Sequence, residues 1–177
     1  MRAFIAVEVD EQLREKMSKL QNQLSLDGVK PVEKENLHLT LQFLGEIDES
    51  MKEKVAQAMD KLSFKKFEMS CKGVGAFPSR NYMRVVWVGA EAPELKEIYS
   101  QLATELVKLG FKQEGFSPHI TLARVKFLKE KEKIIQFLEE NERLELGKCM
   151  VEGVFLKRST LTPKGPIYEN VHEMKLL

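Results

Sequence analysis

The chain has 177 residues, of which 43% are hydrophobic and 31% are charged, as is usual for a soluble globular protein. Its 28 basic and 27 acidic residues leave a formal net charge of +1, which excludes a histone-like or tail-driven binder of nucleic acid. Two cysteines, Cys71 and Cys149, are too few for a disulfide scaffold and lack metal-type spacing, so we expect both to be reduced. No signal peptide and no run of about 18 apolar residues is visible, and we expect a soluble, cytoplasmic protein.

The first half of the chain predicts a strand, a helix, a strand, a helix and a strand. Ala3 to Val9 is apolar and β-branched enough for a buried strand. Asp10 then caps a helix with an apolar stripe, which we expect to end near Gly28. A polar connection runs from Val29 to Asn36. The remaining elements of this half are a strand at 37–44, a helix capped by Asp48, and a half-exposed strand at 67–72.

The second half repeats this order of elements after a predicted loop. Gly73 to Asn81 is rich in Gly, Pro, Ser and Asn, which is typical of a loop. A strand at 83–88 follows, and then a helix that begins at Pro93 and ends before Gly110. The remaining elements are a strand at 117–125, a helix at 130–140, strands around 144–146 and 151–156, and a Pro/Gly turn that leads into a last strand.

One four-residue pattern occurs twice, as HLTL at His38 to Leu41 and as HITL at His119 to Leu122. With three His in the chain, a His followed two places later by a Thr is expected by chance only about 0.08 times. Because side chains alternate along a strand, each copy places its His and its Thr on one face and its apolar residues on the other. The pair of motifs is therefore the strongest indication of a functional site in this sequence.

The two motifs are separated by 81 residues, and the same offset relates the two opening strands. This agreement indicates an internal duplication. We therefore predict an α+β, bilobed fold in which two pseudo-two-fold-related lobes each have a mainly antiparallel sheet and outer helices, with the motifs facing each other across a cleft between two sheets. The whole chain, 1–177, is expected to form a single domain with approximate repeat units 1–73 and 82–156.

Two His and two hydroxyl groups suit acid-base chemistry better than zinc, which prefers three or four His, Cys or carboxylate ligands. Near neutral pH one imidazole can be neutral while the other is protonated. Such a pair fits displacement at phosphorus, in which a base activates the incoming oxygen, an acid protonates the leaving oxygen, and hydroxyl groups hold the non-bridging oxygens. We expect no metal and no cofactor.

Several sequence blocks resemble a known family, namely RAFIAV, ENLHLTLQFLG, the FPS segment followed by RVVWVG, FSPHITLAR and GPIY. Together they are similar to the 2H phosphoesterase superfamily, specifically the bacterial and archaeal 2'-5' RNA ligase (LigT or ThpR type) RNA 2',3'-cyclic phosphodiesterases. The resemblance implies metal-independent hydrolysis of a 2',3'-cyclic phosphate to a 2'-phosphate and, in some members, reversible ATP-independent joining of RNA ends. It implies that His38 is the proton donor, that His119 is the proton acceptor, and that Thr40 and Thr121 bind the phosphate.

Four further residues are candidates for substrate binding. Arg124 follows the second motif, although strict alternation places it on the face opposite to the histidine unless the strand bends. Arg84 lies in a strand expected to border the cleft, where it would serve an RNA phosphate. Phe77 either stacks on a base or fills the core. Gln42 shares the face of the first His and Thr and is a weaker candidate, while Trp87 is expected in the core and His172 at the surface.

Three functions remain open at this stage. The expected partners of the leading one are RNA ends, with tRNA halves among the candidates. A second enzyme function keeps the chemistry but acts on a nucleotide 2',3'-cyclic phosphate or a small nucleotide of the ADP-ribose type. The third is a non-catalytic module that grips an RNA end, which the two histidines argue against because Arg or Lys would suffice for binding. We expect a monomer with no membrane partner.

Overall fold

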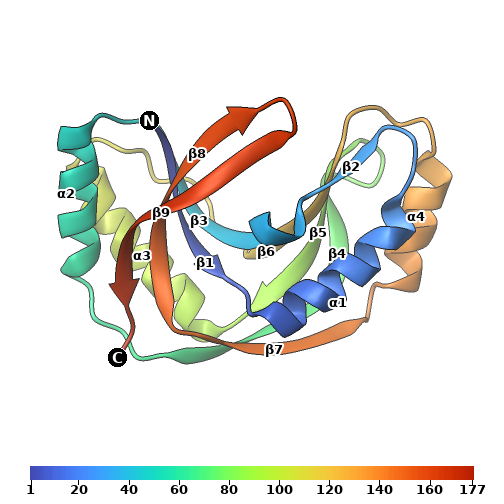
Figure 1. The fold of residues 1–177 in the computed structure, drawn as a ribbon. Coiled ribbons are helices and arrows are strands. Elements are labelled where there is room, and N and C mark those ends of the chain that lie inside the picture. The colour runs from blue at the N-terminus through green and yellow to red at the C-terminus, as the bar shows by residue number, and fades with distance from the viewer.

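The computed structural model describes all 177 residues and has four α-helices and a nine-stranded sheet (Figure 1). In chain order the elements are β1 (Arg2–Glu8), α1 (Glu11–Gln21), the 3-10 turn η1 (Asn22–Leu24), β2 (Val29–Pro31), the 3-10 turn η2 (Lys34–Asn36), β3 (His38–Glu46), α2 (Glu49–Asp60), β4 (Phe67–Pro78), β5 (Met83–Glu91), α3 (Pro93–Lys108), β6 (His119–Val125), α4 (Lys131–Glu140), β7 (Glu145–Val151), β8 (Gly153–Thr162) and β9 (Gly165–Lys175). None of these helices combines the length and the apolar character needed to cross a membrane. The predicted α+β fold is confirmed.

The predicted helix starts are confirmed by their caps. The Asp10 carboxylate accepts a hydrogen bond from the Leu13 amide at 2.9 Å, and the Asp48 carboxylate accepts one from the Met51 amide at 2.8 Å. Each such cap is worth about 1 kcal/mol, because it satisfies an amide that has no partner within the helix. The predicted apolar stripes of α1 and α3 are buried: Leu13, Met17 and Leu20 in α1, and Leu95, Ile98, Leu102 and Leu106 in α3.

The strands form one antiparallel sheet in the order β7-β4-β5-β6-β3-β1-β8-β9, with β2 added to β6. The sequence had predicted two separate sheets. The lobes are instead joined between the two motif strands, where Leu39 of β3 lies opposite Ile120 of β6. No other pair joins these two strands, and β6 continues by pairing with β2 from Ala123 to Val125. The motif strands thus lie side by side at the centre of the molecule.

The internal repeat is visible in the strand register. Ala6 of β1 pairs with Thr40 of β3, and Trp87 of β5 pairs with Thr121 of β6, so both partners are shifted by 81 residues. The neighbouring pairs repeat in the same way: Ile5–Gln42 with Val86–Ala123, Val7–Leu39 with Val88–Ile120, and Glu8–His38 with Gly89–His119. The two lobes are therefore two copies of one strand-helix-strand-helix-strand unit.

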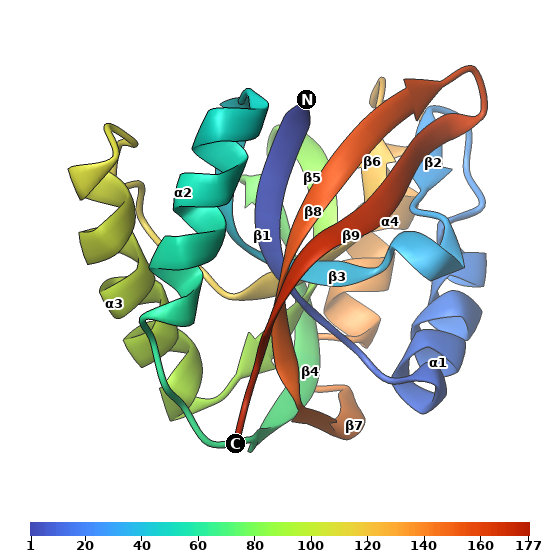
Figure 2. The same ribbon diagram turned by 60° about the vertical axis from the view of Figure 1, so that its left-hand side comes forward.

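The helices hold the two lobes together, because one helix of each lobe packs against elements of the other lobe. Helix α1 follows the first opening strand but packs on β6 and β7 of the second lobe, on the same side as α4 (Figures 1 and 2). Its Lys16 ammonium donates a hydrogen bond to the Leu146 carbonyl of β7 at 2.9 Å. Helices α2 and α3 pack together on the other side of the molecule. A continuous hydrophobic core runs through both lobes.

Two predictions of irregular structure were wrong. The segment from Gly73 to Asn81 was predicted as a loop, but β4 continues to Pro78 and pairs with β5. Gly75 lies in this strand because a Cβ there would overlap the indole ring of Trp87, so packing and not a turn requires the glycine. The connection from Val29 to Asn36 contains the short strand β2, which pairs with β6.

The hairpin of β8 and β9 projects from the edge of the sheet (Figure 1). Strand β8 pairs with β1 only as far as Ser159, which lies opposite Arg2. Beyond that point the two hairpin strands pair only with each other and turn at Thr162 to Gly165. The free part of the hairpin forms one wall of the central cavity described next.

Candidate active site

Both motifs open into one cavity of about 730 Å³. Since Leu39 lies opposite Ile120 in an antiparallel pair, the register places His38 beside Thr121 and Thr40 beside His119. All four side chains line the cavity, whereas the apolar residues of both motifs are buried, and of these only Leu41 also borders the cavity. The structure therefore brings together the four residues that the sequence singled out, from positions 81 residues apart.

The two histidines are oriented in the same way. The Nδ1 atom of His38 lies 2.6 Å from the carbonyl oxygen of Asn36, and the Nδ1 atom of His119 lies 2.6 Å from the carbonyl oxygen of Ser117. Because a carbonyl oxygen only accepts, each Nδ1 carries a proton and donates it. Each Nε2 is then the atom that can exchange a proton with a substrate. In His38 this atom accepts a hydrogen bond from the Thr40 hydroxyl at 2.9 Å.

Burial lowers the pKa of His38 to about 4. The charges of Lys157 and Arg124 lower it further, while the hydrogen bond to the Asn36 carbonyl opposes this shift. His38 is therefore a neutral imidazole near pH 7 when the cavity contains no anion. A negative charge in the cavity would offset the two cations and raise the pKa of His38.

Arg124 reaches the cavity because β6 contains a bulge. Ala123 pairs with Val86 and Thr121 pairs with Trp87, so Leu122 is an extra residue without a partner on β5. Leu122 and Ala123 are consequently both buried, and Arg124 emerges on the face of His119 and Thr121 and lines the cavity. Strict alternation would have placed it on the other face.

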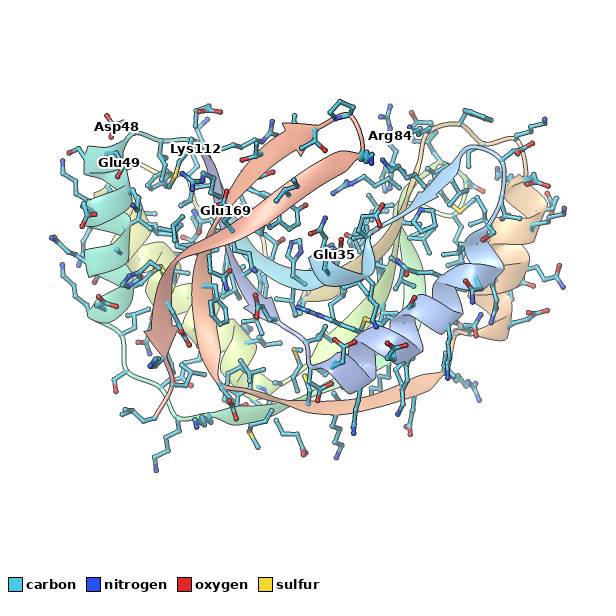
Figure 3. The ribbon with its side chains drawn as sticks, in the orientation of Figure 1. Glu35, Asp48, Glu49, Arg84, Lys112 and Glu169 are labelled. Carbon is cyan, nitrogen blue, oxygen red and sulfur yellow. The ribbon has the colours of Figure 1, made fainter.

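The same bulge occurs in the first motif strand at Leu41, so Gln42 is the equivalent of the buried Ala123. Gln42 is mostly buried but still borders the cavity, and its Nε2 donates to the carbonyl oxygen of Lys112 at 3.3 Å (Figure 3 labels Lys112). Phe43 then takes the place that Arg124 has in the second lobe and is 62% exposed at the cavity. Sequence reasoning missed Phe43, although it follows His38 by five residues as Arg124 follows His119.

Phe77 and Trp87 form the support of the second histidine. The Phe77 ring meets the His119 ring edge-on with centroids 5.0 Å apart, and it also packs on Trp87 at 5.1 Å. Neither aromatic residue is among those that line the cavity. Phe77 thus lies in β4 behind the histidine and not in an exposed loop.

Two other residues considered from the sequence lie outside the cavity. Arg84 stands near the start of β5 (Figure 3), where its guanidinium donates to the Tyr82 hydroxyl at 2.7 and 3.0 Å. His172 on β9 forms a surface pair with Asp60 of α2 at 2.8 Å. The structure does not bring either side chain to the motif residues.

The projecting hairpin adds residues whose place the sequence did not indicate. Tyr168 lies edge-on to His38 with ring centroids 5.3 Å apart, and Phe4 packs on both rings. The side chain of Asn36 donates to the Pro166 carbonyl of the hairpin at 2.9 Å. Ser159 also lines the cavity. Phe4, Asn36 and Tyr168 lie in the family-like blocks RAFIAV, ENLHLTLQFLG and GPIY, but no local pattern gives them a role. The hairpin residues reach the site through the pairing of β8 with β1.

The donor set of the cavity is that of an acid-base site. At the motifs it comprises two imidazoles, each with an Nε2 that can exchange a proton, two Thr hydroxyls and the Arg124 guanidinium. No three side chains of His, Cys, Asp or Glu gather closely enough to hold a metal ion. The arrangement can transfer protons on two sides of a bound anion and hold its oxygens with hydroxyl and guanidinium donors.

Known proteins of the same fold are recognisable over the full length of the chain. A family model described as LigT like Phosphoesterase matches twice, at residues 5–87 and 88–168. RNA 2',3'-cyclic phosphodiesterases of Methanocaldococcus jannaschii and Methanothermobacter thermautotrophicus are 41% and 42% identical over 98% and 99% of this chain and 99% of each relative. The crystal structure of TT0787 of Thermus thermophilus superposes with a TM-score of 0.86 at 30% identity, covering 99% of this chain and 97% of the other. The apo structure of Escherichia coli LigT agrees in fold, with a TM-score of 0.79 at 22% identity over 99% of this chain and 96% of the other. The protein described here therefore belongs to the LigT-like phosphoesterase family.

Proposed function

We propose that this protein is an RNA 2',3'-cyclic phosphodiesterase that opens a terminal 2',3'-cyclic phosphate to a 2'-phosphate. The observation that carries the proposal is the pair of His-Thr motifs on one cavity face, with each histidine held through Nδ1 so that its Nε2 is the atom that can exchange a proton with the substrate. The two archaeal relatives that bear this name support the choice of substrate.

In the proposed reaction His119 takes a proton from water as the water oxygen attacks phosphorus. The bond from phosphorus to the 3' oxygen breaks, and His38 donates its Nε2 proton to that oxygen. Thr40, Thr121 and Arg124 hold the non-bridging oxygens, on which negative charge accumulates in the transition state. The proton lost by water and the proton gained by the leaving oxygen balance, so the histidine pair ends with its two protonation states exchanged.

The low pKa of His38 gives the bound phosphate a further part in this mechanism. A proton donor must be charged before it can act, yet His38 is neutral in the free protein. The phosphate anion brings a negative charge beside Arg124 and Thr40, which favours the imidazolium form of His38. Binding of the substrate thus favours the protonated form of His38 that the reaction needs.

The same geometry supports ligation. If the 5' hydroxyl of a second RNA takes the place of water, His119 deprotonates it and the same 3' oxygen leaves, which yields a 2'-5' linkage. No nucleotide cofactor is needed, because the strained cyclic phosphate is already activated. The reverse reaction follows from microscopic reversibility, so this ATP-independent joining is reversible.

The test is an assay of a short RNA that ends in a 2',3'-cyclic phosphate, performed with excess chelator. We expect conversion to the 2'-phosphate without added metal, and no conversion by the His38→Ala, His119→Ala double variant. Binding without turnover would instead favour a module that only grips RNA ends. Faster turnover of a cyclic phosphate on a small nucleotide of the ADP-ribose type would favour the second enzyme function.

A further inference from the structure

Two like charges face each other at one end of the cavity. Lys30 of β2 lies directly opposite Arg124 of β6 in the antiparallel pairing of these strands. Side chains of directly opposed residues share one face with Cβ atoms about 4.5–5.5 Å apart, and like charges in this position are destabilising. Both side chains are exposed to the cavity, and neither forms an ion pair with a carboxylate.

A third cation comes from the projecting hairpin. The Nζ atom of Lys30 lies 3.6 Å from the position that a Cβ of Gly165 would take, so the hairpin turn approaches this lysine closely. Lys164, the neighbour of Gly165, also lines the cavity without an ion pair. Two carboxylates, Glu33 and Glu114, line the cavity as well, but neither forms an ion pair with these cations. The cluster of cations is thus left without a partner in the protein.

This cluster of Lys30, Arg124 and Lys164 lies beyond the reacting position. Along β6 the cavity face presents His119, then Thr121 beside His38, and then Arg124 beside Lys30. From Thr121 to Arg124 is three residues, or about 10 Å of strand. Arg124 can therefore contact an anion held by the motifs, whereas Lys30 lies one step further along the cavity.

The opposite end of the cavity carries a single cation, Arg2 of β1, in place of the three-cation cluster. There Phe43 occupies the position that corresponds to Arg124, and its ring lies 6.2 Å from that of Phe4. The repeat thus carries an aromatic residue at one end and a cation at the other. Three cations at one end, against one cation and an exposed aromatic residue at the other, favour binding of an extended ligand with its additional phosphate at the Lys30 end.

We propose that Lys30 and Lys164 bind a second phosphate, that of the phosphodiester which joins the terminal, cyclic-phosphate nucleotide to the nucleotide before it. The proposal rests on the proposed function and narrows its substrate class from any cyclic nucleotide to an RNA of at least two nucleotides. The second phosphate offsets the repulsion between Lys30 and Arg124, which the protein alone does not relieve.

The experiment compares three substrates that carry the same terminal 2',3'-cyclic phosphate. The first is a dinucleotide, the second is the same dinucleotide with an uncharged methylphosphonate linkage, and the third is the mononucleotide. We expect Lys30→Gln and Lys164→Gln each to lower kcat/KM on the first substrate by about tenfold, mainly through KM, because one charge-assisted contact to phosphate is lost. On the other two substrates we expect changes below about twofold. Lys54→Gln, at an exposed unpaired lysine of α2, is the control and should leave all three rates unchanged.

Two outcomes with the first three substrates would overturn the proposal. An equal loss on all three substrates would mean that the lysines serve the reacting phosphate, and no loss on any would mean that they bind none. A fourth substrate, an ADP-ribose cyclic phosphate, tests for a pyrophosphate in place of the phosphodiester. Selective loss on this substrate alone would contradict an RNA-specific site.

If the wild-type protein turns over none of these compounds, the proposed function fails but the phosphate site is still tested. Affinities of the dinucleotide with a 2'-phosphate end are then measured by calorimetry with the charged and the uncharged linkage. Tighter binding of the charged linkage that Lys30→Gln abolishes would support the second phosphate site. Equal affinities would refute it.

Discussion

Leu39 and Ile120 form the single backbone pair between the two motif strands, and both side chains are fully buried. Leu39 and Ile120 are equivalent residues of the two repeat units, so their pair lies at the centre of the two-lobed molecule. His38 and His119 each lie next to one member of the pair along the chain. The relative position of the two histidines therefore depends on a packed contact between the lobes and not on any loop.

This contact, together with the exchange of helices between lobes, predicts that neither half folds alone. We infer that the chain is one domain with repeat units 1–73 and 82–156. Without the second unit, α1 would expose the apolar face that packs on β6 and β7. Fragments 1–81 and 82–177 should each lack the native circular dichroism and NMR dispersion and should regain both on mixing. A folded, stable fragment of either kind would contradict the single-domain assignment.

The two threonines are predicted to act on the bound phosphate. Replacing Thr40 or Thr121 by Val keeps the shape of the side chain and removes one hydroxyl donor. We expect kcat to fall by about 10²-fold, as for loss of one donor to a developing negative charge, with a change in Tm of no more than a few degrees. Thr104→Val, on the exposed face of α3, is the matched control. Wild-type rates in both motif variants would show that these threonines only pack.

The protonation of His38 can be followed directly by NMR. In the free protein its ring resonances should titrate with a midpoint near pH 4, since burial and two nearby cations disfavour the charged form. Saturation with inorganic phosphate should move the midpoint upward. Because folding lowers this pKa below the usual 6.5, the unfolded state binds more protons, and the group should reduce stability as pH falls from about 6.5 to about 4. A midpoint near 6.5 in the free protein would contradict the buried, neutral histidine.

The aromatic packing around His119 predicts that a substitution at Gly75, which does not line the cavity, lowers both stability and activity. In Gly75→Ala the new methyl group must displace the Trp87 ring, which packs with Phe77 against His119. We expect a lower Tm and a lower kcat. Adding Trp87→Phe, which shortens the ring, should restore part of both losses. If the losses of Tm and kcat in the Gly75→Ala, Trp87→Phe double variant equal the sum of the losses in the two single variants, the contact between Gly75 and Trp87 does not cause the defect of Gly75→Ala.

Several helices and strands of this fold could be predicted because their sequence signals are local. The caps at Asp10 and Asp48 and the two His-Thr strands depend on residues close together in the sequence. The strand around Gly75 was not predictable, since the need for a glycine comes from Trp87 on the neighbouring strand. The sequence also did not decide which face of β6 carries Arg124, because a bulge is defined by the register of two strands. The hairpin residues near His38 depend on pairing between β1 and β8, at opposite ends of the chain.

The roles of the two histidines are tested most directly with a substrate whose 3' leaving group is far more acidic than a ribose hydroxyl. Such a group departs without a proton, so it should restore most of the rate of His38→Ala and leave His119→Ala nearly inactive. The measurement is kcat/KM of both variants on the activated and the natural substrate. Selective rescue of His38→Ala is the predicted result. Selective rescue of His119→Ala would mean that the roles are exchanged, and equal rescue of both would contradict a dedicated proton donor.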